Sequence, residues 1–162
     1  SCIHDIEAGL KKYSGILIVD NRMLLCYNAA DMYFGFSKFR ETLKWLNRAL
    51  EEQKRTMRTD IICQIKMHLL FTHYELKNMD LLPYLLISTQ KYFLKQARKF
   101  EYELRVFSFF KRALRTGTGA ELRALCAETA EEIRKLAEDP DEKRAMRHFD
   151  YLLWFESKSR SK

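Results

Sequence analysis

The stretch YNAADMYFGFSKFRETLKWLNRAL, residues 27–50, contains two helical segments separated by a break at 35–37. The second segment carries apolar side chains at spacings of four, three and four residues: Phe39, Leu43, Leu46 and Leu50. This spacing places them on one face of an α-helix. In the first segment, Ala29 and Ala30 form a flat patch that another helix can approach closely. Ser37 is predicted to cap the second helix, because its hydroxyl can accept a hydrogen bond from a first-turn N–H. The stretch therefore predicts an antiparallel helix pair.

The composition favours helices along the whole chain. The 162 residues include only five glycines and two prolines, and 47% of them are hydrophobic. Helix-breaking residues are therefore scarce, and the apolar content excludes a disordered chain. No apolar run approaches the roughly 18 residues that a membrane-spanning helix needs, and no signal peptide is visible. We therefore expect a cytoplasmic protein that does not contact a membrane. The chain begins at Ser1 without Met, which is compatible with a fragment of a longer protein.

Periodic apolar positions divide the chain into helix pairs. A box formed by Thr118 and Glu121 predicts one helix start, and the pair Asp139-Pro140 predicts another. The resulting organisation has about eight helices in a single domain. Its segments are an N-terminal helix with a connector (2–20), a first repeat (21–56), a second repeat (57–97), a diverged third pair (98–138) and one C-terminal capping helix (139–160).

The central pair resembles a tetratricopeptide repeat. That family has a small residue midway along its first helix, an aromatic residue one turn later, and an aromatic residue that opens the second helix. The matching positions here are Ala30, Tyr33, Ser37, Phe39 and Ala49, and the pair Tyr27-Asn28 also agrees. Thr42 stands where alanine is usual, and Ser37 replaces the glycine of the turn. The C-terminal segment DPDEKRAMRHFDYLLWFESK, residues 139–158, is similar to the last helix of uncharacterised bacterial tetratricopeptide-like proteins.

The resemblance implies an all-α fold in which antiparallel helix pairs stack as a right-handed solenoid. It also implies that the first helix of each pair lines a concave groove. The side chains placed in this groove are Tyr27, Asp31 and Phe34 from the first repeat, and Gln64, Met67, Phe71 and Tyr74 from the second. Tyr27 and Asp31 occupy positions where some family members carry the lysine and asparagine of a peptide-carboxylate clamp, so that clamp is absent. The alternative is that the aromatic rings belong to the core.

The charge distribution suggests a second surface. Lysine and arginine total 29 against 22 acidic residues, a net charge of +7. The basic residues proposed for this surface are Lys91, Lys95, Arg98, Lys99, Arg105, Lys111 and Arg112. Such a surface would attract an acidic protein or a nucleic acid. The alternative is an ordinary solvated helix face.

Residue patterns of catalysis are missing from the sequence. His68 and His73 are five residues apart, which places them on different sides of a helix and disfavours a zinc pair. Gly117 and Gly119 lack the preceding strand and following Lys-Ser of a phosphate-binding loop. The four cysteines are widely separated, which favours buried, reduced thiols: Cys2, Cys26, Cys63 and Cys126. We therefore expect no enzymatic activity, no metal and no cofactor.

These observations predict a non-enzymatic scaffold module that binds a protein or peptide segment in a concave helical groove. The basic charge suggests an acidic partner. The alternative function is contact with nucleic acid or another polyanion through the basic surface. The oligomeric state and the partner's identity stay open.

Overall fold

The computed structural model describes residues 2–13 and 18–161. Within these residues every regular element is an α-helix and there is no strand, which confirms the predicted all-α class. The described residues form nine helices rather than about eight: α1 (Cys2–Lys12), α2 (Val19–Gly35), α3 (Phe39–Glu51), α4 (Thr59–Glu75), α5 (Leu82–Lys95), α6 (Glu101–Ala113), α7 (Gly119–Leu136), α8 (Pro140–Ala145) and α9 (Tyr151–Arg160). The chain divides inside α5 into two compact units, Ser1–Leu85 and Leu86–Lys162. Residues 14–17 of the predicted connector lie outside the described part.

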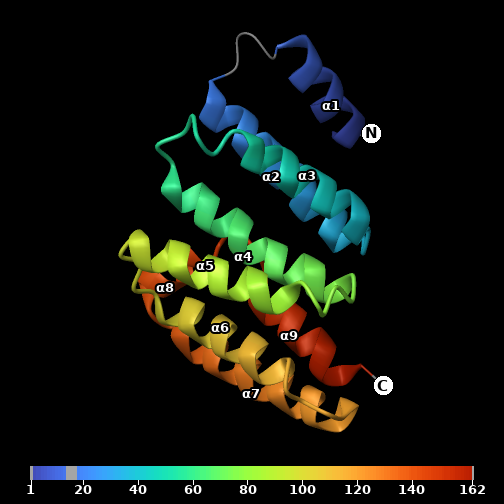
Figure 1. Cartoon of the computed structure of the whole chain (residues 1–162), viewed down its shortest axis with the longest axis vertical. Coiled ribbons are helices and arrows are strands. Elements are labelled where there is room, and N and C mark those ends of the chain that lie inside the picture. Colours follow the sequence, from blue (N-terminus) through green and yellow to red (C-terminus); the bar gives the residue numbers. More distant parts are fainter. Residues whose placement is uncertain (1, 14–17, 162) are drawn as a thin grey trace. The chain divides into compact units, whose positions relative to one another are not determined.

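The first unit is built on the pair formed by α2 and α3, which lie side by side (Figure 1). Ala29 and Ala30 of α2 are fully buried, as are Leu46 and Ala49 of α3. The three alanine side chains allow the two helix backbones to approach closely, as the sequence predicts for Ala29 and Ala30. Helix α4 contacts both α2 and α3, and α1 contacts α2.

Ser37 does not cap α3, contrary to the prediction. Its φ angle is +57°, and the residue at the N-cap position is Lys38, which makes no side-chain capping bond. The backbone N–H of Ser37 donates to Phe34 O, and the N–H of Lys38 donates to Tyr33 O. Ser37 therefore ends α2 in the left-handed conformation that usually favours glycine at the end of a helix.

Ala97, just after α5, has the same unfavourable conformation, with a φ angle of +51°. A side chain with a Cβ is strained there, whereas glycine is not. We expect Ala97→Gly to raise the free energy of unfolding by about 1 kcal/mol in a urea titration. Ala127 is exposed in the interior of α7, so Ala127→Gly should instead lower it by about 1 kcal/mol. A loss of stability in Ala97→Gly would contradict this assignment of strain.

The second unit has an aromatic core. Phe109 of α6 lies edge-on to Trp154 and Phe155 of α9, at ring-centroid distances of 5.8 and 4.8 Å. Helix α7 contacts both α6 and α9. The predicted capping box opens α7: Thr118 Oγ accepts from the backbone N–H of Glu121, and the Glu121 carboxylate accepts from that of Thr118.

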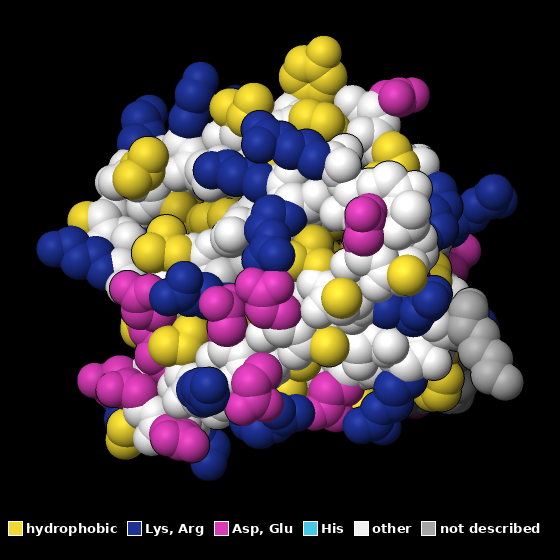
Figure 2. Space-filling model, turned by 90° about the horizontal axis from the view of Figure 1, so that it is seen from below, with side chains coloured by type: hydrophobic (Ala, Val, Ile, Leu, Met, Phe, Trp, Pro, Cys, Tyr) yellow, Lys and Arg dark blue, Asp and Glu magenta, His cyan; other side chains and the backbone are white. Residues whose placement is uncertain are grey.

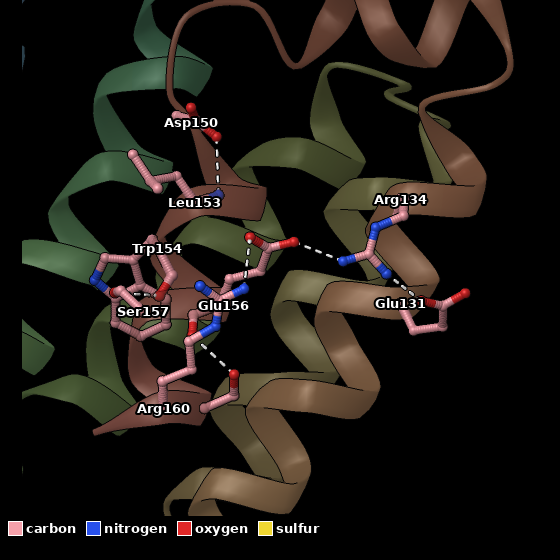
Figure 3. Close-up of polar contacts among 9 residues, drawn as sticks. Glu131, Arg134, Asp150, Leu153, Trp154, Glu156, Ser157 and Arg160 are labelled. Atoms are coloured by element: carbon pink, nitrogen blue, oxygen red, sulfur yellow. Dashed lines mark hydrogen bonds and ion pairs between the residues drawn. The ribbon is translucent and has the colours of Figure 1, made fainter. Parts of the chain in front are cut away.

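The predicted C-terminal helix is divided into α8 and α9. Asp139 caps α8 as expected, with Pro140 in its first turn. A new helix start lies at Asp150, whose carboxylate accepts a hydrogen bond from the backbone N–H of Leu153 at 2.9 Å (Figure 3). This second cap favours a break over a continuous helix, because Asp stabilises the start of a helix. The division explains why the structure has more helices than the sequence predicts.

Ion pairs connect α9 to α7. Arg134 of α7 contacts Glu131 on its own helix and reaches Glu156 of α9, where Nη2 and Oε1 are 2.6 Å apart (Figure 3). Arg160 lies on the other side of Glu156, at 3.7 Å. Arg134, Glu131 and Arg160 are exposed and Glu156 is partly exposed, so the pairs add little stability beyond the aromatic core.

Candidate interaction surface

The predicted groove residues on α2 and α4 are mostly buried. Asp31 is exposed and Phe34 is partly exposed. The remaining five are buried: Tyr27, Gln64, Met67, Phe71 and Tyr74. The His68 ring of α4 lies edge-on to the rings of Tyr27 and Phe34, at 5.7 and 4.9 Å. This face of α2 therefore packs against α4, which favours the core interpretation of the rings over an open groove.

Burial has an electrostatic consequence at His68. It lowers the pKa of the His68 imidazole from 6.5 to about 3, because the charged form is poorly solvated there. Below pH 6.5 the unfolded chain therefore binds a proton at this residue that the folded chain does not bind. Stability should fall as the pH decreases from 6.5 toward 3, with a slope of about 1.4 kcal/mol per pH unit from this residue.

Urea unfolding of the wild type and of His68→Leu at several pH values measures this contribution as the difference between the two curves. We expect the variant to lose less stability than the wild type between neutral pH and pH 4. Parallel curves for the two proteins would show that His68 is not held neutral by burial.

The predicted basic surface does not include the guanidinium of Arg98. That side chain is only 13% exposed and forms an ion pair with the buried Glu103, with Nε 2.6 Å from Oε1. It also lies over the rings of Phe93 and Phe100, at 5.5 and 5.1 Å. Burial raises the pKa of Glu103, and the hydrogen bond from Arg98 acts in the opposite direction. Arg98 is therefore part of the interior of the second unit.

Two more predicted basic residues are paired on the surface. Arg112 makes a bidentate ion pair with Glu128, in which its two Nη atoms lie 2.7 and 2.8 Å from the two carboxylate oxygens. The hydrogen bond from Arg112 lowers the pKa of the Glu128 carboxyl. Arg105 lies 3.6 Å from Glu101, as its i, i+4 spacing predicts. Acidic and basic side chains also intermix on the face drawn in Figure 2, especially in its lower part. The seven basic residues thus do not form one uncompensated positive surface.

The remaining four, Lys91, Lys95, Lys99 and Lys111, are exposed and make no ion pair within the described part of the chain. Two of them lie on α5 beside exposed apolar side chains. Ile87 is 52% exposed and Leu94 is 79% exposed. We call these four residues of the second unit the outer stripe: Ile87, Lys91, Leu94 and Lys95.

The outer stripe lies opposite the buried side of α5. The buried side chains of that helix are Leu82, Leu86, Thr89 and Phe93. Ile87, Lys91 and Leu94 are spaced by four and three residues, so they share a face that points away from the buried one. Tyr84, one turn before Ile87, is exposed as well. A helix that is apolar on two opposite faces usually packs between two layers. Here one of those faces contacts solvent.

Sequence reasoning selected Lys91 and Lys95 but missed Ile87 and Leu94. The signal that could have found them is the second apolar period on α5, offset from the one that forms the core. Amphipathic patterning identifies the buried face of a helix well. It does not identify a second, exposed apolar face on the same helix.

Two of the described cysteine thiols are perturbed by burial. Burial raises the pKa of the Cys26 and Cys126 thiols to about 11, which disfavours the nucleophilic thiolate. Cys63 is also buried. No group of three or more His, Cys, Asp or Glu residues that could hold a metal ion is found among residues 2–13 and 18–161. In the same part of the chain, no helix has the length and apolar character needed to cross a membrane.

Comparison with protein-family models, with curated proteins and with solved structures gives no match for this chain. The outer stripe is therefore interpreted from its own residues.

Proposed function

We propose that this chain is a non-enzymatic helical module that binds a protein segment, and that the outer stripe of α5 is its contact surface. The observation that carries the proposal is the exposure of Ile87 and Leu94 on the side of α5 opposite the core. Apolar side chains that repeat along one exposed face mark interaction sites more often than isolated ones do. The resemblance to tetratricopeptide-like proteins, whose stacked helix pairs serve as binding scaffolds, agrees with this function.

Because most of the predicted groove residues on α2 and α4 are buried, we place the proposed contact surface on α5 instead. Tyr27 and Phe71 are not available for contact in this conformation. Ile87 and Leu94 are available without any rearrangement, and removing them from water on binding would contribute favourably. Lysine side chains beside them would steer an acidic partner toward the site.

Contact with nucleic acid is the second candidate, and the exposed lysines are the observation that favours it. Lys91, Lys95 and Lys99 could each approach a phosphate group. This function leaves the exposed Ile87 and Leu94 without a role, so protein binding explains more of the surface.

Affinity capture with the double variant Ile87→Ser/Leu94→Ser tests the proposal. Both positions are exposed, so the variant should keep its helical circular dichroism and its urea midpoint. Proteins captured by the wild type should be lost. The matched control is Leu153→Ser, because Leu153 is 62% exposed on α9 and lies outside the outer stripe. If the double variant captures the same proteins as the wild type does, the outer stripe is not the contact surface.

A further inference from the structure

We propose that the partner segment of the outer stripe is an amphipathic α-helix with acidic residues beside its apolar ones. This inference rests on the proposed function and adds the chemistry of the partner. It is carried by the spacing of the exposed apolar side chains and by the two lysines next to them.

The spacing fits a helix. Ile87 and Leu94 are seven residues apart, which is two turns and roughly 10 Å along the axis of α5. A second helix that packs alongside presents side chains at the same interval, so its residues i and i+7 can contact both positions. On α5, the apolar side chains of Ile87 and Leu94 stand at the two ends of this interval, and Lys91 lies between them.

The charges fit acidic residues on that helix. Lys91 lies between Ile87 and Leu94, and Lys95 lies one turn beyond Lys91. Neither makes an ion pair within the described residues, and α5 itself contains no aspartate or glutamate. A partner that covered the apolar side chains would also bring its own groups close to these two ammonium groups. Carboxylates there would form charge-assisted hydrogen bonds, whereas basic groups would be repelled.

Other occupants fit less well. A second copy of α5 would place its Lys91 and Lys95 near those of the first, because the helix has no acidic residue to offer. A membrane-surface helix carries its lysines on the face opposite its apolar residues, whereas Lys91 lies between Ile87 and Leu94 on the same face. A nucleic acid would neutralise the lysines but leave the apolar side chains uncovered.

Selection from a displayed library of helical peptides tests the inference. One selection uses the wild type, and a parallel selection uses Lys91→Glu/Lys95→Glu. Peptides enriched on the wild type should carry apolar residues at i and i+7 with acidic residues beside them. Peptides enriched on the variant should carry basic residues at those same acidic positions, because the sign of the stripe is reversed.

Fluorescence anisotropy with one peptide enriched on the wild type gives the quantitative result. Lys91→Glu/Lys95→Glu should weaken its binding by about tenfold or more, and Ile87→Ser/Leu94→Ser should have at least as large an effect. The control variants Lys111→Glu and Leu153→Ser change an exposed lysine and an exposed leucine outside the stripe. Both should bind the peptide as the wild type does.

The possible failures are distinguishable. If the enriched peptides are neutral or basic but still require Ile87 and Leu94, the acidic partner is wrong and the proposed function survives. If no enriched peptide requires Ile87 and Leu94, both proposals are overturned. Vesicles containing phosphatidylserine and a short RNA serve as two further probes. If either binds in a stripe-dependent way while no peptide does, the partner is a membrane or a nucleic acid and the inference is wrong.

Discussion

Glu103→Ala is expected to lower the free energy of unfolding by about 3–5 kcal/mol, a large effect for a single substitution. The side chain of Glu103 is buried at the start of α6, and its carboxylate pairs with the guanidinium of Arg98. The hydroxyl of Tyr102 also lies 3.4 Å from the Glu103 carboxylate. Removing the carboxylate leaves a guanidinium that is 13% exposed without its charged partner. Urea unfolding followed by circular dichroism measures the loss.

Replacing both partners separates the charge effect from the packing effect. The double variant Arg98→Met/Glu103→Leu removes the two charges together and keeps apolar volume beside Phe93 and Phe100. It should recover most of the stability lost in Glu103→Ala, because an apolar pair of similar size can replace a buried ion pair. If the double variant is less stable than Glu103→Ala, the contribution of Glu103 does not come from its pairing with Arg98.

Phe71→Ala is expected to destabilise the protein by about 3–5 kcal/mol, the range found when a buried phenylalanine is truncated. Phe71 on α4 has no exposed surface. The result decides between the two interpretations of the aromatic residues on α4, because a groove residue could be truncated without loss of stability. The control is Phe36→Ala, since Phe36 is 70% exposed after α2 and should tolerate the change. Equal urea midpoints for Phe71→Ala and the wild type would restore the groove interpretation.

Much of the helical architecture could be predicted from the sequence, because the determining signals are local. The small residues Ala29 and Ala30 predict a close helix contact, and the structure buries both. The capping box at Thr118 and the cap at Asp139 predict two helix starts that the structure contains. The cap predicted at Ser37 is wrong, because serine favours an N-cap in general but Ser37 adopts the left-handed conformation that ends α2.

The candidate site was less predictable, because it depends on which side chains meet in space. The local pattern places Arg98 on a basic surface, since nothing in it shows that Glu103, five residues later, is buried against Arg98. The groove residues were placed by the geometry of the tetratricopeptide family, whereas their burial depends on how α2 packs on α4. The exposure of Leu94 depends on which face of α5 meets the core, and both of its faces carry apolar residues.

The central claim is that the outer stripe of α5 contacts a protein partner, and site-specific photocrosslinking tests it most directly. A benzophenone amino acid is placed at Leu94, at Leu153 or at Phe36, which are all exposed, and the protein is irradiated in the presence of cell extract. The proposal predicts a discrete crosslinked product at position 94 that is absent at positions 153 and 36. It also predicts that Ile87→Ser and Lys91→Glu, introduced together, abolish that product. Discrete products at position 153 or 36, with none at position 94, would contradict the claim.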